Sequence, residues 1–351
     1  MRRSCRNRIQ SAAPCSFDSI EGAYRSAILR SGMDHTPQTE LNRGERKNPM
    51  SAPSESARID QGPSPSTRSM LVVADLDLNA TLFDHLLTRE WAVEYVSSNE
   101  EALSLLRKRS FDLILTAEGT SAKEDLSLLK QIRAVRPRTR MIILARESTP
   151  QDVILALRQH AFSIFTRPYS FETLKDMIEM AMERPSWDDG IEVVQATPSW
   201  ARFLVRCDTG TAERMMQFFS EMIDLPEEEK GQVAYALREM VMNAIAHGGK
   251  FDPSQYVEVG YLHTRHMVGC RIKDPGQGFA LDELLHAAIA NPLDDPVRHI
   301  TIREAQGLPP GGYGILLSRH LVDELLYNEK GNEVVLLKYL RGDAPPGVAG
   351  A

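Results

Sequence analysis

The sequence predicts an α/β protein, and three features of the 351-residue chain lead to this prediction. Apolar strands and amphipathic helices alternate over residues 70–184, which is the pattern of a doubly wound parallel sheet. A helix with polar residues at every fourth position follows at residues 236–248, and two glycine-rich segments come after it. Residues 1–69 show little apolar periodicity, so the folded part is expected to begin near residue 70.

The segment 1–69 is rich in Ser, Pro and Arg, a composition that is typical of disordered chains. Its Arg-rich start is followed by no apolar run, so a signal peptide is not predicted. Met50 and Met70 are candidate alternative starts. Residues 342–351 are expected to form a flexible tail.

The composition indicates a globular protein with room for two domains, because 42% of the residues are hydrophobic and the net charge is only −7. No basic stripe suggests direct nucleic-acid binding. No apolar run approaches the ~20 residues that span a bilayer, so we expect no membrane contact and a cytoplasmic location. The cysteines show no metal-binding spacing and are expected to be reduced, with Cys270 in a core strand; they are Cys5, Cys15, Cys207 and Cys270.

The elements of residues 70–184 follow one another with short connections. Buried strands are expected at residues 69–77, 111–119, 140–148 and 162–170, and helices at residues 99–110, 125–135, 150–161 and 171–184. Right-handed crossovers place helices on both faces of such a sheet. Pro185 ends the last helix, and residues 185–193 are expected to be a linker.

The helix at residues 236–248 places Glu239, Asn243 and His247 four residues apart, which aligns them along one face. Apolar residues Ala236, Met240 and Ala244 form a neighbouring stripe. A carboxylate, an amide and an imidazole on a half-buried stripe need partners, which favours a functional site. A solvated helix face remains the alternative at this point.

The first glycine-rich segment follows an apolar strand at residues 268–272. Asp274 ends that strand and can accept a hydrogen bond from a ligand amino group, while Gly276 and Gly278 allow close approach to the backbone. An ordinary Asp-Pro-Gly turn is the alternative.

The second glycine-rich segment contains Gly311, Gly312 and Gly314 and leads into an apolar helix expected to reach Leu325. A glycine-rich loop at a helix start presents free N–H groups and the positive end of the helix dipole, which suit phosphate. A simple glycine-containing helix entry is the alternative.

These three segments, in this order, resemble the Bergerat-type ATP-binding fold of histidine kinases, gyrase and Hsp90-like ATPases. DPGQGF, AHG and GILLSRHLVDELLY are most similar to the anti-sigma-factor serine kinases within that superfamily. No phosphoacceptor-histidine helix hairpin of the histidine-kinase type precedes them. The resemblance implies that residues 194–341 form the α/β sandwich of a histidine-kinase-type ATPase that binds ATP and Mg²⁺.

The resemblance also implies roles for individual residues of the helix. Asn243 is expected to hold Mg²⁺ against the ATP phosphates, and Glu239 is expected to act as the general base. His247 matches a histidine that is common in the family, although a core or capping role is equally consistent with the sequence.

The glycine-rich segments receive their roles in the same way. Asp274 is expected to bind the adenine amino group, and Gly276 and Gly278 to shape the surface that receives the base. Gly312 and Gly314 are expected to lie against the phosphates.

Residues 280–310 correspond to the lid over the nucleotide. Arg298, His299 and Arg303 are three candidates to reach the γ-phosphate, and the sequence does not choose among them.

Family members often have a threonine before the closing strand, here residues 334–339, but this chain has Asn332 or Glu333 at that place. The adenine contact of that threonine is therefore not expected here.

Residues 70–184 resemble the receiver domain of response regulators, but the phosphorylation chemistry is incomplete. Where receivers have an acidic pair after the first strand, this chain has Ala74 and Asp75, with Asp77 nearby. The phosphoacceptor position is Ala117, which has no oxygen, and Glu118 beside it faces the other way.

The receiver's switch position is Ala145, and Arg167 replaces the usual lysine before Pro168. We therefore expect a degenerate receiver that is not phosphorylated and that serves as a docking or dimerisation surface. A generic α/β domain is the alternative.

The favoured function is a protein-serine/threonine kinase that phosphorylates a small anti-sigma-factor antagonist and also holds a sigma factor. The alternative is a nucleotide-gated module that sequesters a partner without phosphotransfer. A hybrid histidine kinase is disfavoured, because no phosphoacceptor helix precedes the ATP-binding segments; His85 and His160 lie in the receiver helices, where exposed or capping histidines are common. A homodimer stays open.

Overall fold

The computed structural model describes residues 68–74, 91–117, 120–183, 190–280, 284–292, 294–308 and 310–340. The expected disordered leader up to residue 67, the acidic residues Asp75 and Asp77, Glu118, and Pro185 lie outside these ranges. The expected tail at residues 342–351 also lies outside them.

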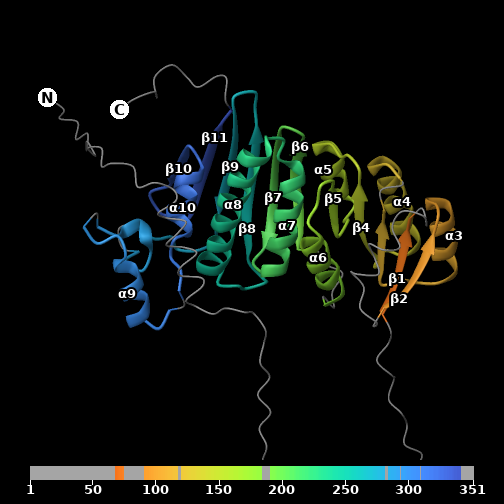
Figure 1. Ribbon diagram of the computed structural model, residues 1–351, viewed down its shortest axis with the longest axis horizontal. Coiled ribbons are helices and arrows are strands. Elements are labelled where there is room, and N and C mark those ends of the chain that lie inside the picture. The colour runs from red at the N-terminus through yellow and green to blue at the C-terminus, as the bar shows by residue number, and fades with distance from the viewer. Residues whose placement is uncertain are drawn as a thin grey trace, which may run out of the picture. The chain divides into compact units, whose positions relative to one another are not determined.

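The N-terminal domain contains a five-stranded parallel sheet in the order β2-β1-β3-β4-β5 (Figure 1). Its strands are β1 (Arg68–Val73), β2 (Trp91–Val96), β3 (Leu113–Thr116), β4 (Arg140–Ala145) and β5 (Ser163–Thr166). This order is the doubly wound arrangement of the flavodoxin and receiver type. Strand β2 was not predicted, because it is a half-exposed edge strand and lacks the continuous apolar run of the central strands.

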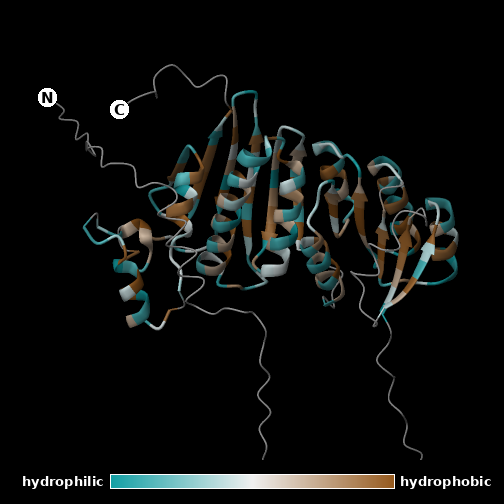
Figure 2. Ribbon diagram, in the orientation of Figure 1, coloured by the Kyte–Doolittle hydropathy of each residue, from teal (hydrophilic) through white to brown (hydrophobic). Residues whose placement is uncertain are grey.

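In the described part of this domain the helices that cover the parallel sheet are α3 (Asn99–Lys108), α4 (Ala122–Val135), α5 (Pro150–Arg158) and α6 (Phe171–Glu183). Helices α4 and α5 begin with capping boxes, formed by Ser121 with Glu124 and by Thr149 with Asp152. Alternate strand residues belong to two separate apolar clusters, so both faces of the sheet are buried. Figure 2 shows the central strands as predominantly hydrophobic.

The C-terminal domain contains a six-stranded antiparallel sheet in the order β10-β11-β9-β8-β7-β6. Its strands are β6 (Ile191–Thr197), β7 (Trp200–Arg206), β8 (Tyr256–His263), β9 (Met267–Lys273), β10 (Glu324–Tyr327) and β11 (Glu333–Tyr339). Strand β6 begins inside the segment that the sequence assigned to a linker, because Ile191 pairs with Val205 of β7.

Helices α7 (Thr209–Met222), α8 (Glu227–Asn243) and α10 (Gly314–Leu321) belong to this domain. The apolar face of α8 is buried as predicted, with Ala236, Met240 and Ala244 all less than 10% exposed. Alternate residues of the strands, such as Val257 and Val259 of β8, are buried in the same apolar cluster.

The shorter elements between β9 and α10 are the 3-10 helix η3 (Ala288–Ala290) and α9 (Arg298–Ala305). The prediction that the last helix reaches Leu325 is wrong. Helix α10 ends at Leu321, and Leu325 lies in β10, where it pairs with Leu336 of β11. The fold class is confirmed: an α/β chain with a parallel-sheet domain followed by an antiparallel-sheet domain.

Candidate functional site

The first part of the site is helix α8 and the turn that follows it. Three glutamates in the first turn of α8 complement the positive end of its dipole. Glu239 and Asn243 are half-buried on α8. After Asn243 the chain widens into a π-helix, η1 (Ala244–Gly248), and the Gly249 N–H donates to the Ala244 carbonyl at 2.8 Å. Widened turns of this kind occur frequently at functional sites.

The widened turn changes the position of His247 relative to the other two residues. Glu239 and Asn243 remain one α-helical step of four residues apart, whereas His247 lies beyond the change of register and is exposed. His247 is close enough to Asp274 for its charge to oppose the burial that raises the pKa of that carboxyl. The structure thus associates His247 with Asp274.

Asp274 follows β9 and is held on both sides. Its backbone N–H donates to the Asn332 carbonyl at 3.0 Å, and Asn332 Nδ2 donates to the Asp274 carbonyl at 3.2 Å. Its Oδ1 accepts the Gly276 N–H at 2.7 Å. Asn332, one of the two residues that stand where the family often has a threonine, therefore fixes the backbone of Asp274.

Two glycines allow α8 to approach Asp274. A Cβ on Gly248 would lie 2.3 Å from Asp274 Cγ, and one on Gly276 would lie 2.8 Å from Gly248 Cα. No side chain fits at either position without movement. The glycine of AHG and the first glycine of DPGQG are thus the two points where the helix end and the loop meet.

The second glycine of the loop packs against the β10–β11 turn. Gly278 has φ +80°, and a Cβ there would lie 1.9 Å from the Lys330 carbonyl oxygen. Lys330 Nζ donates to the Gly276 carbonyl at 3.0 Å. The rings of Phe279 and Tyr327 meet edge to face with centroids 5.4 Å apart. The loop therefore contacts the β10–β11 turn on one side and Gly248, the last residue of η1, on the other.

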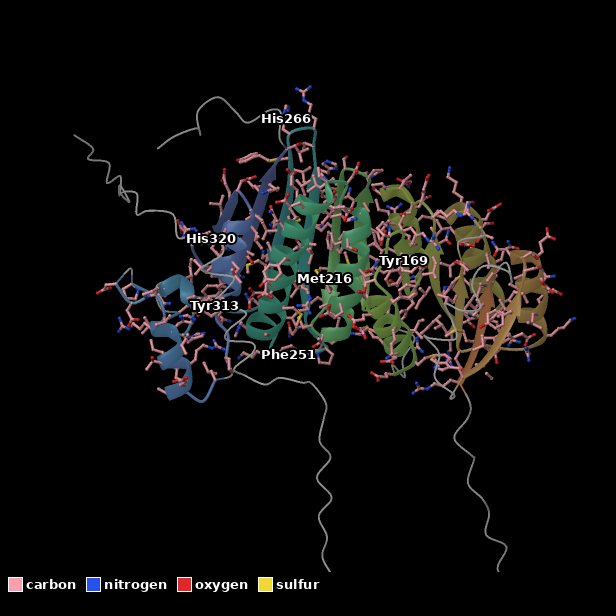
Figure 3. The ribbon with its side chains drawn as sticks, viewed as in Figure 1. Tyr169, Met216, Phe251, His266, Tyr313 and His320 are labelled. Carbon is pink, nitrogen blue, oxygen red and sulfur yellow. The ribbon has the colours of Figure 1, made fainter. Side chains whose placement is uncertain are left out.

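The glycine loop before α10 brings the start of that helix against Glu239 of α8. Gly311 and Gly312 have φ values of +145° and +91°, and Gly314 is the first residue of α10. A Cβ on Gly314 would lie 2.2 Å from Glu239 Oε2. The Glu239 carboxylate therefore touches the N-terminal end of α10. Figure 3 labels Tyr313 and His320 near the two ends of that helix.

The lid contacts the glycine loop through its backbone and one aromatic pair. The Ala288 N–H donates to the Gly312 carbonyl at 2.8 Å. His299 is fully buried, its N–H donates to Asn291 Oδ1 at 2.9 Å, and its ring meets Tyr313 edge to face at 4.5 Å. Of the three lid candidates, His299 packs beside the glycine loop, while Arg298 is exposed at the start of α9. Arg303 is half-buried on α9.

Both carboxylates of the site have raised pKa values. Burial raises the pKa of Glu239, and the charge of Arg238 opposes that shift. Burial also raises the pKa of Asp274, opposed by the Gly276 hydrogen bond and by the charges of Lys330 and His247. A carboxylate with a raised pKa is a stronger base at neutral pH.

The residues present fit a purine nucleotide with Mg²⁺. Asp274 Oδ2 accepts no hydrogen bond from the described part of the chain, so it is available to an amino group. The Asn243 side chain makes no capping bond, which leaves its amide oxygen for a cation. No side chain caps α10, so its first N–H groups can face phosphate.

The receiver positions show a different chemistry. Ala117 directly follows β3 and is 2% exposed, and Ala145, the last residue of β4, is fully buried. Ala74 is likewise buried. The Arg167–Pro168 peptide bond is cis, and Arg167 is exposed. Methyl groups thus occupy the strand ends where receiver chemistry would require oxygen atoms.

Comparisons with known proteins agree with this division. Residues 70–179 match the family of response regulator receiver domains, and residues 206–338 match the family of histidine kinase-like ATPase domains. The chain therefore contains a receiver domain and an ATPase domain of the histidine kinase-like type. The second match implies ATP binding, and the pair indicates a signalling regulator.

Curated relatives match about two fifths of the chain or less. Transcriptional regulatory protein ZraR of Escherichia coli O157:H7 is 23% identical over 171 residues, covering 42% of this chain and 39% of that protein. Transcriptional regulatory protein GlrR of Escherichia coli K12 is 27% identical over 122 residues, covering 34% of this chain and 28% of that protein. The chain spans about two fifths or less of the length of these relatives.

Solved receiver structures are similar over about a third of the chain. A CheY-like receiver domain protein from Methanospirillum hungatei JF-1 is 20% identical, with 34% of this chain and 95% of that chain covered and a TM-score of 0.30. CheY4 of Vibrio cholerae is 21% identical, with 33% and 100% covered and a TM-score of 0.30. None of the helices in the described part of the chain has the length and apolarity that a bilayer-spanning segment needs.

Proposed function

We propose that this chain is a Mg²⁺- and ATP-dependent protein-serine/threonine kinase of the anti-sigma-factor type. Its substrate would be a hydroxyl of a small anti-sigma-factor antagonist, and its second partner a sigma factor. The observation that supports this best is the contact between the Glu239 carboxylate and Gly314 at the start of α10. It puts a candidate base beside the N–H groups that suit the phosphates.

In the proposed reaction ATP supplies the γ-phosphoryl group and Mg²⁺ offsets the phosphate charge. The partner's hydroxyl oxygen bonds to the γ-phosphorus, the bond from that phosphorus to the β–γ bridging oxygen breaks, and ADP leaves with its electron pair. The hydroxyl proton passes to Glu239. Asn243 holds the cation, Asp274 accepts from the adenine amino group, and the α10 backbone orients the phosphates.

A nucleotide-gated binding module is the second candidate. The Glu239 carboxylate contacts the helix end that phosphate would approach, and under this second candidate nucleotide entry displaces it. Such a movement can switch the affinity for a partner without any transfer. The receiver, with Ala117 at its phosphoacceptor position, is consistent with regulation by contact.

Incubation of the purified chain with γ-labelled ATP, Mg²⁺ and candidate antagonist proteins separates the two functions. The kinase predicts label on a serine or threonine of the partner, lost in Asn243→Ala and in Glu239→Gln, with nucleotide binding retained in the latter. ATP-dependent complex formation without label on the partner supports the binding module and contradicts the kinase.

A further inference from the structure

Helix α7 of the ATPase domain covers an open edge of the receiver sheet. Strand β5 is the last strand of that sheet, so its outer backbone groups need partners. Arg214 Nε donates to the Phe162 carbonyl at 3.0 Å, just before β5, and Gln217 Nε2 donates to the Ile164 carbonyl at 3.0 Å. The two residues are three positions apart, on one face of α7.

The Arg214 contact is specific rather than incidental. Its side chain is only 1% exposed, and its guanidinium carbon lies 4.4 Å from the centre of the Phe162 ring. A buried guanidinium is tolerated only where its donors and its face are occupied. Gln217 Nε2 also donates to Glu221 Oε1 at 3.0 Å, one turn further along α7, which holds the Gln217 amide in place. One face of α7 thus lies along the edge of the receiver sheet at Phe162 and Ile164.

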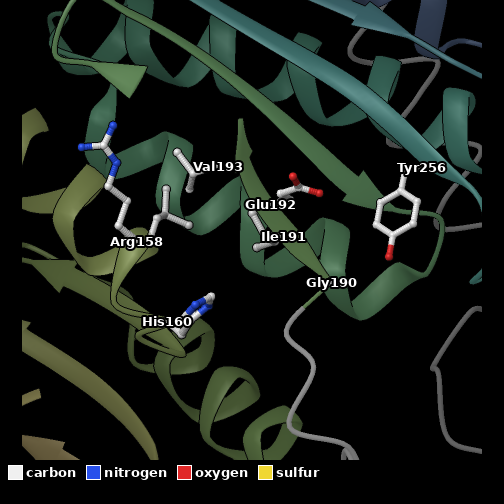
Figure 4. A pocket seen from close by; sticks show the side chains of 8 residues that line it. Arg158, His160, Gly190, Ile191, Glu192, Val193 and Tyr256 are labelled. Carbon is white, nitrogen blue, oxygen red and sulfur yellow. The ribbon is translucent and has the colours of Figure 1, made fainter. Parts of the chain in front are cut away.

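Away from α7 the contact between the receiver domain and the ATPase domain, called the seam below, is less tightly packed. Arg158 of α5 donates to the Ala196 carbonyl of β6 at 3.0 Å. Beside this bond lies a cavity of about 400 Å³ lined by Leu157 and His160 of the receiver and by Ile191 and Tyr256 of the ATPase domain (Figure 4). The close contacts between the two domains therefore concentrate along α7.

Helix α7 also reaches the residue beside the candidate base. Glu213 is the neighbour of Arg214, about 100° around the helix, so the two side chains point in different directions. Nε of Arg238 donates to Glu213 Oε2 at 3.4 Å, and its Nη2 donates to Oε1. This two-pronged pair joins α7 to α8 one residue before Glu239. The positive charge of Arg238 acts on the Glu239 carboxylate.

We propose that the receiver domain supports the nucleotide site through α7: Arg214 and Gln217 hold α7 to strand β5, and Glu213 with Arg238 sets the position of Glu239. Glu213 and Arg238 are positioning residues, since neither is required to touch the substrate. This inference rests on the kinase proposed above. It explains how a receiver with Ala117 at its phosphoacceptor position can still act on the ATPase domain, namely by contact.

The test uses the full chain with three variants of α7, called the seam variants, which are Gln217→Leu, Glu213→Gln and Arg214→Met, and with two matched controls. Gln217→Leu removes the bond to β5, and its control Gln131→Leu removes a bond from Gln131 to its own helix, α4. Glu213→Gln weakens the pair with Arg238, and its control Glu179→Gln weakens a pair within α6. Arg214→Met should act in the same direction as Gln217→Leu, which remains informative if the arginine variant fails to fold.

Three quantities are measured: the Kd for Mg-ATP by calorimetry, kcat at saturating ATP, and amide hydrogen exchange in β5 and α7 with and without Mg-ATP. We expect the seam variants to lower kcat about tenfold while Kd changes less than about twofold, because positioning acts on the reaction more than on binding. The controls should match the wild type. Mg-ATP should slow exchange in β5 of the wild type but not of Gln217→Leu.

Equal kcat values in seam variants and controls would overturn the inference for catalysis. A Mg-ATP effect on β5 exchange that survives in Gln217→Leu would overturn it for coupling. If the wild type transfers no phosphate, the proposed kinase fails, yet the exchange measurement still decides whether nucleotide and receiver are coupled. If the ion pair with Glu213 positions Glu239, Arg238→Lys, which retains the charge, should keep a larger fraction of the wild-type kcat than Arg238→Gln. If Arg238 contributes only packing, the two variants should lose kcat equally.

Discussion

Gly314→Ala tests the contact between Glu239 and α10 without changing the chemistry of the base. A Cβ at Gly314 would lie 2.2 Å from Glu239 Oε2 and 3.3 Å from Cδ, whereas real Cβ contacts are essentially never shorter than 3.0 Å. The carboxylate must therefore retreat by about 0.8 Å or rotate away. Gly314 has no positive φ, so alanine introduces no backbone strain of its own.

A displacement of that size should be visible in the reaction rate. Misplacement of a catalytic group by about 1 Å can lower a rate by about a hundredfold. We expect single-turnover transfer from γ-labelled ATP to fall on the order of a hundredfold in Gly314→Ala at saturating nucleotide. Thermal unfolding should change little, because the atom that yields is the end of a flexible side chain.

Gly231→Ala is the matched control for this substitution. Gly231 lies on α8, the helix that carries Glu239, and nothing lies within 4 Å of a Cβ built there. Alanine should stabilise this exposed helix position by about 0.5–1 kcal/mol and leave transfer unchanged. Wild-type transfer rates in a folded Gly314→Ala chain would refute the assignment of Glu239 as a base poised at α10.

Three further predictions concern charge and protonation. Glu239→Gln should lower phosphoryl transfer by about 10²–10⁴-fold, whereas Glu228→Gln, at an exposed residue of the same helix, should leave it unchanged. Burial raises the pKa of Glu239 in the folded chain, so ionisation of this carboxyl lowers the stability of the fold as the pH rises above the unfolded-state pKa. The urea midpoint of Glu239→Gln should therefore exceed that of the wild type at pH 7.5 but not at pH 4.5. Asp274→Asn keeps the Oδ1 acceptor for Gly276 and removes the second acceptor together with the charge. Calorimetry should show roughly tenfold weaker ATP binding, and the melting temperature at pH 7.5 should be no lower than that of the wild type, because burial raises the pKa of Asp274. Burial raises the thiol pKa of Cys207 to about 11 and that of Cys270 to about 12. In a variant with Cys5 and Cys15 replaced by serine, no thiol should therefore react with a disulfide reagent at pH 8 until denaturant is added. The free energy of unfolding should fall as the pH rises from 9 through 11, because the unfolded chain ionises these thiols first.

The sequence predicted the parts of the fold in which local pattern and burial coincide. The central parallel strands are continuous apolar runs, and each is buried on both faces. Strand β2 was missed because an edge strand needs only one buried face, and Glu94 interrupts its apolar run. Leu325 was placed in a helix because its spacing from Leu321 suits a helix, while pairing with β11 decides for a strand.

The candidate site was predictable as a set of residues but not as a geometry. Spacing placed Glu239 and Asn243 on one helix face, but it gave no sign of the π-helix after Asn243 or of the close approach of Gly249, at its end, to Cys207, which is 42 residues away in sequence. The approach of Gly248 to Asp274 is likewise a tertiary contact. Its only sequence signal is the glycine itself, where a helix would otherwise continue.

The receiver has buried alanines at the ends of its strands, whereas the ATPase domain has half-buried carboxylates at its candidate site. In the receiver, Ala74, Ala117 and Ala145 are at most 3% exposed and join the apolar core, an arrangement that favours stability and excludes phosphoryl chemistry. In the ATPase domain, Glu239 and Asp274 are carboxylates whose burial raises their pKa, so each lowers stability at neutral pH. Apolar or amide side chains would remove that penalty, and the contacts to Gly314 and Gly276 would not require a charge. The presence of two unfavourable carboxylates, Glu239 beside the N-terminus of α10 and Asp274 against Gly248 and Gly276, therefore argues that reaction or ligand binding, rather than folding, determines these two positions.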